Sequence, residues 1–289
     1  MVPLPVAIAG IIGALTTACF IAWAGSTASV QWSGWPVFAL CGVLAFAIQW
    51  VMFIQSWLAR SEHLYDLTGS ITYVLMIAFA LWAGTPDTRA WLLGLLIFVW
   101  AARLGPFLFM RIREAGEDRR FRTIKTSFHT LLMTWTLQGL WVFLTAACAL
   151  AAITGAARAP LGVFAAVGTA LWVIGFAIEV IADRQKSAFR ANPENADAFI
   201  TTGLWAWSRH PNYFGEIVLW VGIAVISYPV LVGWQLATLI SPIWVVLLLT
   251  MISGVRMLEN RGRKRWGNDP EYQHYLETVP VLIPRKPRA

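Results

Sequence analysis

The amino-acid sequence predicts an all-α integral membrane protein, a bundle of seven to eight transmembrane helices. Hydrophobic residues make up 58% of the 289-residue chain, charged residues only 13%, and the mean hydropathy is +0.63. A soluble domain carries about 25% charged residues, so this chain lacks the ionic surface of a water-soluble protein. Its 17 Trp and 16 Phe are typical of a protein that meets lipid headgroups. The composition therefore excludes a soluble enzyme, a disordered protein and a nucleic-acid-binding protein that relies on a basic surface.

Eight apolar stretches have roughly the 20-residue length that a helix needs to cross a bilayer. The first lacks the basic segment of a signal peptide and precedes further spans, so we interpret it as a retained helix. The third and seventh are short, which leaves the count at seven or eight. No stretch is typical of a separate soluble domain, so 1–289 is predicted to be one membrane domain. The predicted spans are 2–23, 37–58, 67–83, 90–110, 130–153, 161–182, 217–232 and 239–257.

The basic residues predict the orientation of the bundle. Most of the 22 Lys and Arg lie in three stretches, 111–125, 184–209 and 256–289, and two spans separate each stretch from the next. The three stretches are therefore expected on one side, and the positive-inside rule makes that side, with the C-terminus, cytoplasmic. The connections expected on the opposite side, 25–34, 84–89 and 155–160, are short.

Ionisable side chains at the depth of the apolar spans are candidates for function, because each is costly there unless it is paired or faces a polar cavity. Glu179 and Asp183 lie one turn apart at the end of the sixth span, and a continuing helix places Lys186 and Arg190 on the same face. This stripe is either a salt-bridged helix end or a polar wall for a large anionic ligand, with Arg190 for a phosphate.

The densest polar segment is GLWAWSRHPNYFGEIVLWVG, 203–222. Pro211 and Gly215 predict a turn that leads into a helix N-terminus, and the unpaired N–H groups of such a helix start suit an anion. Donors gathered so closely are costly beside lipid, so we expect a polar ligand here. The polar side chains of the segment are Arg209, His210, Asn212, Tyr213 and Glu216.

Four further polar residues stand in or beside other spans. Arg256 closes the last span, with Asn260 one turn later, and is a candidate ligand. Arg103 lies within the fourth span, and Gln138 lies within the fifth. An Arg at that depth is unfavourable unless it is paired or faces a polar cavity, so Arg103 and Gln138 are further candidates.

Tyr65 and Asp66 precede the third span and are the candidate catalytic residues of the N-terminal half. Asp66 is open to two interpretations. Its carboxylate either caps the N-terminus of the following helix or faces a pocket as a proton donor or as a clamp on a substrate carbonyl.

Motifs of soluble nucleotide and metal sites are absent from the sequence. It contains no GxGxxG, P-loop, HExxH or GxSxG. The three cysteines lie in apolar runs without a CxxC pair, so neither a disulfide framework nor a metal site is predicted. A nucleotide, if one binds, is expected between helices.

The run GLWAWSRHPNYFGEIVLWVG, with IEVIADRQKSAFR before it and a basic tail ending in VPVLIPR after it, resembles the membrane-embedded steroid 5-alpha-reductase family in its bacterial branch. The element RHPNYFGE also resembles one found in isoprenylcysteine carboxyl methyltransferases and, more loosely, in sterol reductases. The resemblance to the reductases implies a protein of a bacterial inner membrane. It further implies that about 111–289 forms a cytoplasmic-side NADPH pocket, and that the helices of about 1–110 line the substrate cavity.

The resemblance also implies roles for single residues. The family holds its substrate ketone with a Glu, preceded by Gln, and with a Tyr on the next helix. These positions match Asp66, Tyr65 and Trp100, so Asp66 and Tyr65 are expected to be catalytic, and Trp100 and Gln138 to contact substrate. The family's His-rich stretch after the last span is replaced here by Asn260 and its neighbour. The expected cofactor-binding residues are Arg103, Glu179, Asp183, Arg190, Arg209, His210, Asn212, Tyr213, Glu216, Arg256 and Asn260.

The implied reaction reduces a carbon–carbon double bond conjugated to a ketone in an apolar, steroid-like substrate. Hydride moves from NADPH to the β carbon while protonated Asp66, with Tyr65, hydrogen-bonds the carbonyl oxygen. The substrate enters from the bilayer, and no nucleic acid or obligate protein partner is expected beyond membrane lipid. One alternative is an S-adenosylmethionine-dependent methyltransferase, whose sulfonium ligand needs carboxylates and aromatic faces more than arginines. The other is a non-enzymatic membrane protein or transporter, which predicts no nucleotide binding.

Overall fold

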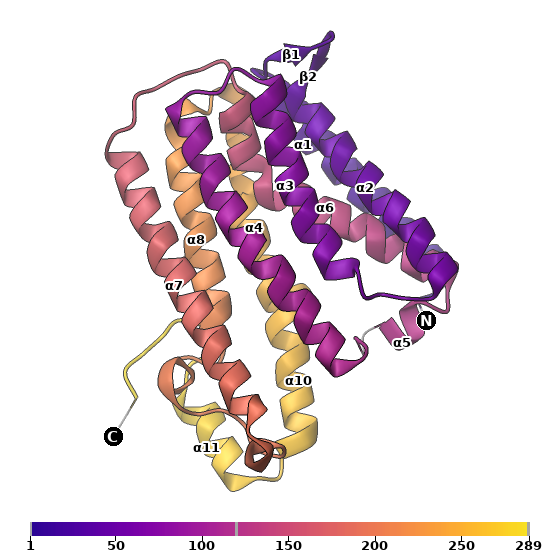
Figure 1. Ribbon diagram of the computed structural model, residues 1–289, viewed down its shortest axis with the longest axis vertical. Helices are drawn as coiled ribbons and strands as arrows, with labels where there is room; N and C mark the ends of the chain where they lie inside the picture. Colours follow the sequence, from indigo (N-terminus) through magenta and orange to yellow (C-terminus); the bar gives the residue numbers. More distant parts are fainter. Residues whose placement is uncertain (1, 119–120, 288–289) are drawn as a thin grey trace. The chain divides into compact units, whose positions relative to one another are not determined.

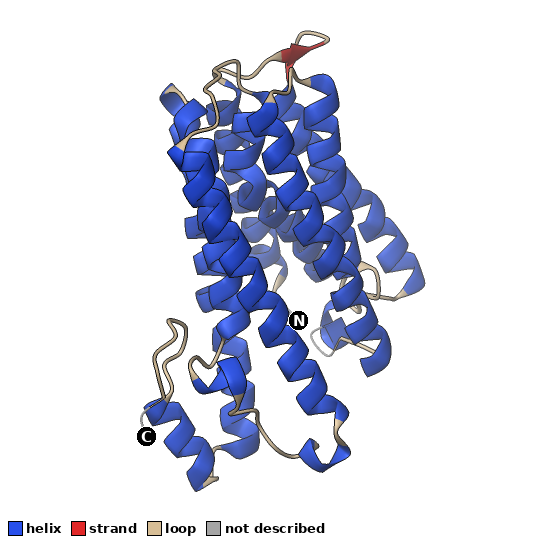
Figure 2. Ribbon diagram, turned by 60° about the vertical axis from the view of Figure 1, so that its left-hand side comes forward, coloured by secondary structure: helices blue, strands red, loops and turns tan. Residues whose placement is uncertain are grey.

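The computed structural model describes residues 2–118 and 121–287. In these ranges the regular secondary structure is helical apart from one short hairpin, and eight segments are long and apolar enough to cross a membrane (Figures 1 and 2). The predicted all-α fold is therefore confirmed, with eight candidate spans in the described residues. Contacts divide the chain into two compact units, which are described separately.

The first unit comprises Met1–Ala165 and Ile226–Ser241. These boundaries differ from those of the predicted functional halves, 1–110 and 111–289, which stay a prediction. The elements of the unit are α1 (Leu4–Ser26), β1 (Gln31–Trp32), β2 (Trp35–Pro36), α2 (Val37–Ala59), α3 (Tyr65–Ala83), α4 (Thr88–Ala115), α5 (Phe121–Ile124), α6 (Phe128–Thr154), η3 (Tyr228–Val230) and η4 (Gly233–Leu239).

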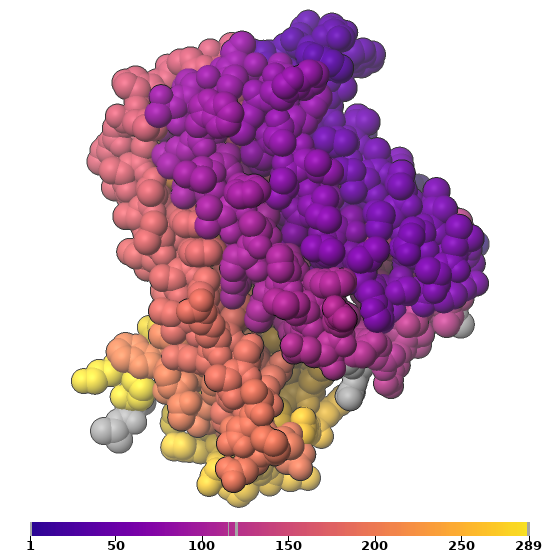
Figure 3. Space-filling model, in the orientation of Figure 1, coloured from indigo at the N-terminus to yellow at the C-terminus, as the bar shows by residue number. Residues whose placement is uncertain are grey.

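Helix α6 is the centre of the first unit. Nearly all of its apolar stretch is buried, whereas α1 leaves most of its surface exposed. Two glycines allow α2 and α6 to pack closely. A Cβ at Gly42 would lie 3.0 Å from the ring of Phe143, and one at Gly139 would lie 3.0 Å from the ring of Phe46. Small residues at such contacts are what membrane helices use to approach one another. Figure 3 shows the outer surface of the N-terminal part of this unit in indigo to magenta.

The three short connections predicted to share one side of the bundle lie together at one end of this unit. The Val30 N–H donates to the carbonyl oxygen of Thr154 at 2.7 Å, and Arg158 donates to that of Thr85 at 2.5 Å. Arg89 is buried and donates to the carbonyl oxygens of Ile226 at 2.6 Å and Pro160 at 2.9 Å. Each connection thereby satisfies backbone groups of another, as apolar surroundings require.

The second unit comprises Ala166–Val225 and Pro242–Ala289. Helix α7 continues past the predicted end of the sixth span to residue 191, so the stripe that begins with Glu179 and Asp183 does lie on one helix, as expected. The elements that make up this unit are α7 (Val163–Ala191), η1 (Pro193–Asn195), η2 (Gly203–Ala206), α8 (Pro211–Ser227), α9 (Ile240–Leu247), η5 (Leu248–Ile252), α10 (Gly254–Trp266) and α11 (Pro270–Thr278).

Helices α7 and α8 touch through their backbones. A Cβ at Gly215 would lie 2.5 Å from the carbonyl oxygen of Gly175, and one at Gly222 would lie 2.5 Å from that of Gly168. The expected turn does lead into a helix start, but it ends before Pro211, so the expectation that Pro211 and Gly215 themselves break regular structure is wrong. Pro211 is the first residue of α8, a position that needs no N–H donor, and Gly215 lies within the helix, where its missing side chain permits this contact.

The last span is not one regular helix. Between α9 and α10 the chain forms a π turn, η5, and the N–H of Ser253 donates to the carbonyl oxygen of Leu248 at 3.0 Å. Gly254 opens α10, and a Cβ there would lie 2.8 Å from the ring of Tyr213 on α8. Single π turns are frequent at functional sites, and the residues that follow this one include Arg256 and Asn260.

Candidate functional site

The contact between α7 and α8 brings polar side chains of both helices together. Glu179 is only 2% exposed and Asp183 only 7%. Asn212, in the first turn of α8, donates from Nδ2 to Oδ1 of Asp183 at 3.2 Å. Glu216 follows Asn212 by one turn on the same helix and is half-buried. The predicted carboxylate stripe and the predicted start of the seventh span therefore meet, which the sequence could not establish.

The segment before α8 is held against the end of α7. Trp205 is buried, and its Nε1 donates to the carbonyl oxygen of Ala182 at 3.0 Å. Lys186 places its ammonium group 4.2 Å from the centre of the Trp205 ring, which is a cation–π contact. Lys186 thus faces an aromatic ring within the stripe, whereas Arg190, one turn further along, is exposed.

The turn that leads into α8 meets α10 at a carboxylate. Nη1 of Arg209 lies 3.0 Å from each carboxylate oxygen of Glu259, and Nε2 of His210 lies 3.4 Å from Oε1. The ring of His210 stacks on that of Tyr213 with 5.5 Å between ring centres and 7° between their planes. Glu259 therefore joins α10 to the turn, although it is not among the site residues predicted from the sequence.

Burial lowers the pKa of the His210 imidazole below its ordinary value, and the nearby positive charges of Lys186 and Arg209 act in the same direction. The hydrogen bond to Glu259 opposes this shift without overcoming it. Because desolvation disfavours the charged form, His210 is neutral at neutral pH. Its Nδ1 is buried and has no hydrogen-bond partner among the residues that the structure describes.

A pocket of about 380 Å³ lies along α10 and the π turn before it. It contains two of the predicted cofactor-binding residues, Arg256 and Asn260, and both are exposed. Two guanidinium groups and one amide suit a phosphate, because an arginine presents N–H donors in the geometry that phosphate oxygens accept. The lining residues are Thr250, Met251, Val255, Arg256, Glu259, Asn260 and Arg263.

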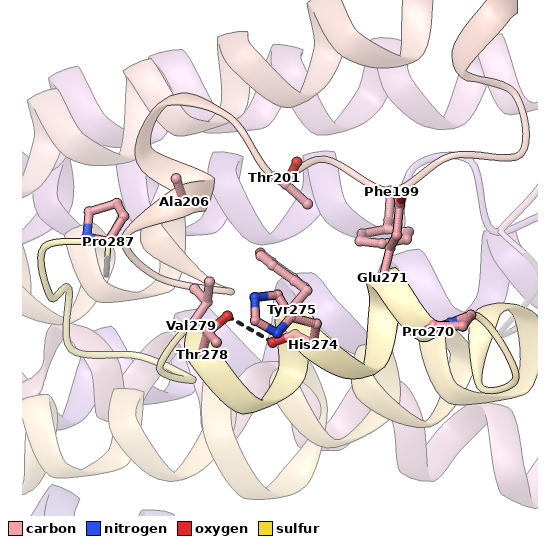
Figure 4. A pocket seen from close by; sticks show the side chains of 10 residues that line it. All are labelled: Phe199, Thr201, Ala206, Pro270, Glu271, His274, Tyr275, Thr278, Val279 and Pro287. Carbon is pink, nitrogen blue, oxygen red and sulfur yellow. Dashed lines mark hydrogen bonds between the residues drawn. The ribbon is translucent and has the colours of Figure 1, made fainter. Parts of the chain in front are cut away.

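A larger pocket of about 550 Å³ lies beside α11 (Figure 4). None of the predicted site residues lines it. The hydroxyl of Thr278 donates to the carbonyl oxygen of His274 at 2.7 Å, and that of Tyr275 donates to the carbonyl oxygen of Trp205 at 2.9 Å. These two hydroxyls therefore stabilise the local backbone. The lining residues are Phe199, Thr201, Ala206, Pro270, Glu271, His274, Tyr275, Thr278, Val279 and Pro287.

The predicted catalytic and substrate residues lie in the first unit. Helix α3 begins at Tyr65 and its N-cap position is Leu64, so the interpretation of Asp66 as the N-cap is wrong; Asp66 is in the first turn. The Tyr65 hydroxyl donates to the carbonyl oxygen of Thr134 at 3.2 Å, and Nε2 of Gln138 donates to the carbonyl oxygen of Tyr65 at 2.8 Å. Tyr65, Asp66 and Gln138 are thus gathered at the junction of α3 and α6.

Trp100 and Arg103 lie on α4 of the same unit. Trp100 is buried and meets the ring of Tyr73 edge-on, with 5.1 Å between ring centres. The guanidinium of Arg103 lies 4.8 Å from the centre of the Phe107 ring. Tyr73 was missed in the sequence, although it stands two turns after Asp66 and so shares its helix face.

A second carboxylate of the first unit was also missed. Glu62 is 1% exposed, accepts the Asp118 N–H at 3.1 Å and pairs with the ammonium group of Lys125 at 2.8 Å. It stands in the polar loop between two spans, where hydropathy gives no sign of burial. Its pairing with a lysine far along the chain could be found only from the fold.

A family model described as "Protein of unknown function (DUF1295)" matches residues 50–279, most of the chain. The chain belongs to the DUF1295 family. This DUF1295 protein is 36% identical to the 3-oxo-5-alpha-steroid 4-dehydrogenase 1 of Bos taurus over 70 residues, which cover 24% of the chain and 27% of the bovine enzyme. It is 23% identical to an uncharacterized protein of Schizosaccharomyces pombe over 258 residues, 78% of the chain and 72% of the relative. No solved structure matches.

These relatives and the eight apolar helices identify the DUF1295 protein as an integral membrane protein. The resemblance to steroid reductases is supported by the similarity to the bovine enzyme, which the chain matches over about a quarter of that enzyme's length.

Proposed function

We propose that this DUF1295 protein is a membrane-embedded, NADPH-dependent reductase of a carbon–carbon double bond conjugated to a ketone in an apolar, steroid-like substrate. The similarity to the bovine 3-oxo-5-alpha-steroid 4-dehydrogenase 1 supports an oxidoreductase. The pocket lined by Arg256, Asn260 and Arg263 is the observation that favours NADPH as the cofactor. Guanidinium groups suit the phosphates of a dinucleotide and do not suit the sulfonium cation of S-adenosylmethionine.

The residues of the second unit fit the other groups of a dinucleotide. Buried Glu179 and the linked pair of Asp183 and Asn212 offer acceptors and donors for ribose hydroxyls and for a carboxamide. Bound NADPH would supply the hydride for the β carbon of the enone. The task of Glu179, Asp183 and Asn212 is then to orient the cofactor, and that of Arg256 is to neutralise phosphate charge.

The residues of the first unit supply the proton chemistry in this proposal. Asp66 is half-buried in the first turn of α3. In its protonated form it donates a hydrogen bond to the substrate carbonyl oxygen as negative charge develops there, and the enolate that forms then takes up a proton from solvent at its α carbon. The hydroxyl of Tyr65 is engaged by the carbonyl oxygen of Thr134, so Tyr65 orients the start of α3 and the donor role falls to Asp66. Buried Trp100 and Tyr73 offer apolar faces for a substrate that arrives from the bilayer.

A thermal-shift titration of the detergent-purified protein tests the cofactor. A ligand that binds only the folded state at 100 times its Kd adds about 2.7 kcal/mol of stability, so the melting temperature rises. We expect NADPH to raise it more than NADH and S-adenosylmethionine to leave it unchanged. Stabilisation by S-adenosylmethionine alone would replace the reductase with a methyltransferase, and no shift with any of the three would favour a non-enzymatic protein.

A turnover assay tests the substrate class. NADPH consumption is followed by absorbance with a 3-oxo-4-ene steroid, and the matching saturated 3-oxo steroid serves as the control. The proposal expects consumption with the enone alone and a product saturated at that double bond. Equal consumption with both compounds would point to reduction of the ketone instead.

A further inference from the structure

The pocket along α10 that contains Arg256 and Arg263, called the cationic pocket from here on, is also lined by a carboxylate. Glu259 lines the pocket together with Arg256 and Arg263. A carboxylate at this position repels any anionic ligand, and like charges a few ångströms apart in a partly buried site cost appreciable energy. Binding of a phosphate group therefore requires that the charge of Glu259 be compensated from outside the pocket.

Arg209 provides that compensation. Its Nη1 lies 3.0 Å from both carboxylate oxygens of Glu259, and its side chain is only 10% exposed while that of Glu259 is 15% exposed. The backbone holds it there, because the Arg209 N–H donates to the carbonyl oxygen of Pro280 at 2.9 Å. Arg209 is absent from the pocket lining and approaches Glu259 from the turn before α8.

Arg263 is placed differently. It follows Glu259 by one turn on α10, its Nη2 lies 3.9 Å from Oε2, and its side chain is 57% exposed. This long, solvated contact leaves the guanidinium open to a second anion, since an exposed i,i+4 pair contributes little. Arg256, one turn before Glu259, is also exposed and lines the same pocket.

We infer that Arg209 is the counter-ion of Glu259 and not a phosphate ligand, and that Arg256 and Arg263 are the residues that bind a phosphate group of the dinucleotide. This inference rests on the proposed function. It changes the role expected for Arg209 and adds Arg263 to the site. Arg209 is then a positioning residue, because it acts on the ligand only through the charge of Glu259.

A double-mutant cycle distinguishes a counter-ion from a ligand. NADPH affinity is measured on the full-length protein in detergent for the wild type, Arg209→Met, Glu259→Gln and the double variant. Arg209→Met exposes an uncompensated carboxylate to the ligand, so its Kd rises about tenfold. Glu259→Gln in the same chain removes that charge and restores a Kd close to that of the wild type. The cycle isolates the coupling between the two residues.

Three further variants complete the test. Arg209→Lys retains a positive charge beside Glu259 and is expected to bind NADPH nearly as well as the wild type. Arg263→Gln loses a ligand, so its Kd rises about tenfold whether or not Glu259→Gln is present. Arg265→Gln is the matched control, because Arg265 lies on the same helix but pairs with Asp197 at 2.7 Å, and its Kd should not change.

The outcomes separate this inference from the proposed function. Failure of the wild type to bind NADPH overturns the proposed function and the inference with it. Binding by the wild type, followed by a loss in Arg209→Met that Glu259→Gln does not restore, makes Arg209 a direct ligand and overturns the inference alone. An unchanged Kd in Arg263→Gln overturns the role of Arg263. Melting temperatures of all variants identify any that fail to fold, and Arg209→Lys keeps the role of Arg209 testable in that event.

Discussion

His210 is a buried imidazole between Glu259 and Tyr213, and this position makes the protein sensitive to acid. Its pKa is lowered by burial, whereas in the unfolded chain the group titrates near 6.5. Below that pH the unfolded state binds more protons than the folded state. The stability associated with a neutral His210 is therefore complete above pH 6.5 and is lost progressively as the pH falls below it.

We expect His210→Gln to flatten this part of the pH dependence, because an amide does not titrate in this range. The measurement is the melting temperature of both proteins across a series of pH values on either side of 6.5. His274→Gln is the control, since His274 is exposed on α11. Curves for His210→Gln and the wild type that keep the same slope below pH 6.5 would contradict this account.

The proposed role of Asp66 can be tested by removing its carboxyl group. Asp66→Ala removes the proposed donor to the substrate carbonyl, and loss of such a group costs about a hundredfold or more in rate. NADPH affinity should remain nearly that of the wild type, because the cofactor is assigned to residues of the other unit. The check compares turnover with the NADPH Kd for the variant. Equal loss of both would show that Asp66 supports the fold or the cofactor and not the chemistry.

The sequence identified single residues of the site better than it identified their partners. Asp183 and Asn212 were both candidates because polar groups at the edge of apolar spans need an explanation, yet their hydrogen bond depends on how α7 and α8 cross. Glu259 was missed because it lies among basic residues after the last span, and such residues are typical of the cytoplasmic side of a membrane protein. Its burial against Arg209 arises from the fold of a turn fifty residues earlier in the chain.

Among the elements, the α7–α8 contact gives a prediction about helix packing. A Cβ at Gly215 would lie 2.5 Å from the carbonyl oxygen of Gly175, so Gly215→Ala must push the helices apart. Overpacking of this kind costs about 1–3 kcal/mol, and we expect a lower melting temperature together with weaker NADPH binding. Gly13→Ala on α1 is the control, because nothing lies within 4 Å of its Cβ position. A Gly215→Ala protein as stable as the wild type would disprove the backbone contact.

Hydropathy located the spans but not the polar ends of the helices. The expected sixth span ended at 182 and the seventh began at 217, whereas α7 continues to Ala191 and α8 begins at Pro211. The apolar signal stops where charged residues begin, although the hydrogen-bonded helix does not. Asp183 and Asn212 meet in these polar turns. The residues left out of the predicted spans therefore include part of the candidate site.

For the whole molecule, the distribution of basic residues predicts its orientation. The stretches 111–125, 184–209 and 256–289 should all face the cytoplasm. A fluorescent protein that folds only in the cytoplasm, fused after residue 289 and expressed in a bacterial host, is expected to fluoresce. A fusion to a phosphatase that is active only outside the cytoplasm is the complementary control. An active phosphatase with a dark fluorescent fusion would reverse the orientation.

The π turn Leu248–Ile252 also determines the direction in which the side chains of α10 point relative to those of α9. Each residue of an α-helix advances the chain by about 100°. Removing one residue from this turn would rotate the face of α10 that carries Arg256, Glu259 and Arg263 by roughly a quarter of a circle relative to α9. Deletion of Ile252, which does not line the cationic pocket, would therefore keep every lining side chain in the protein and yet redirect those of Arg256, Glu259 and Arg263 together.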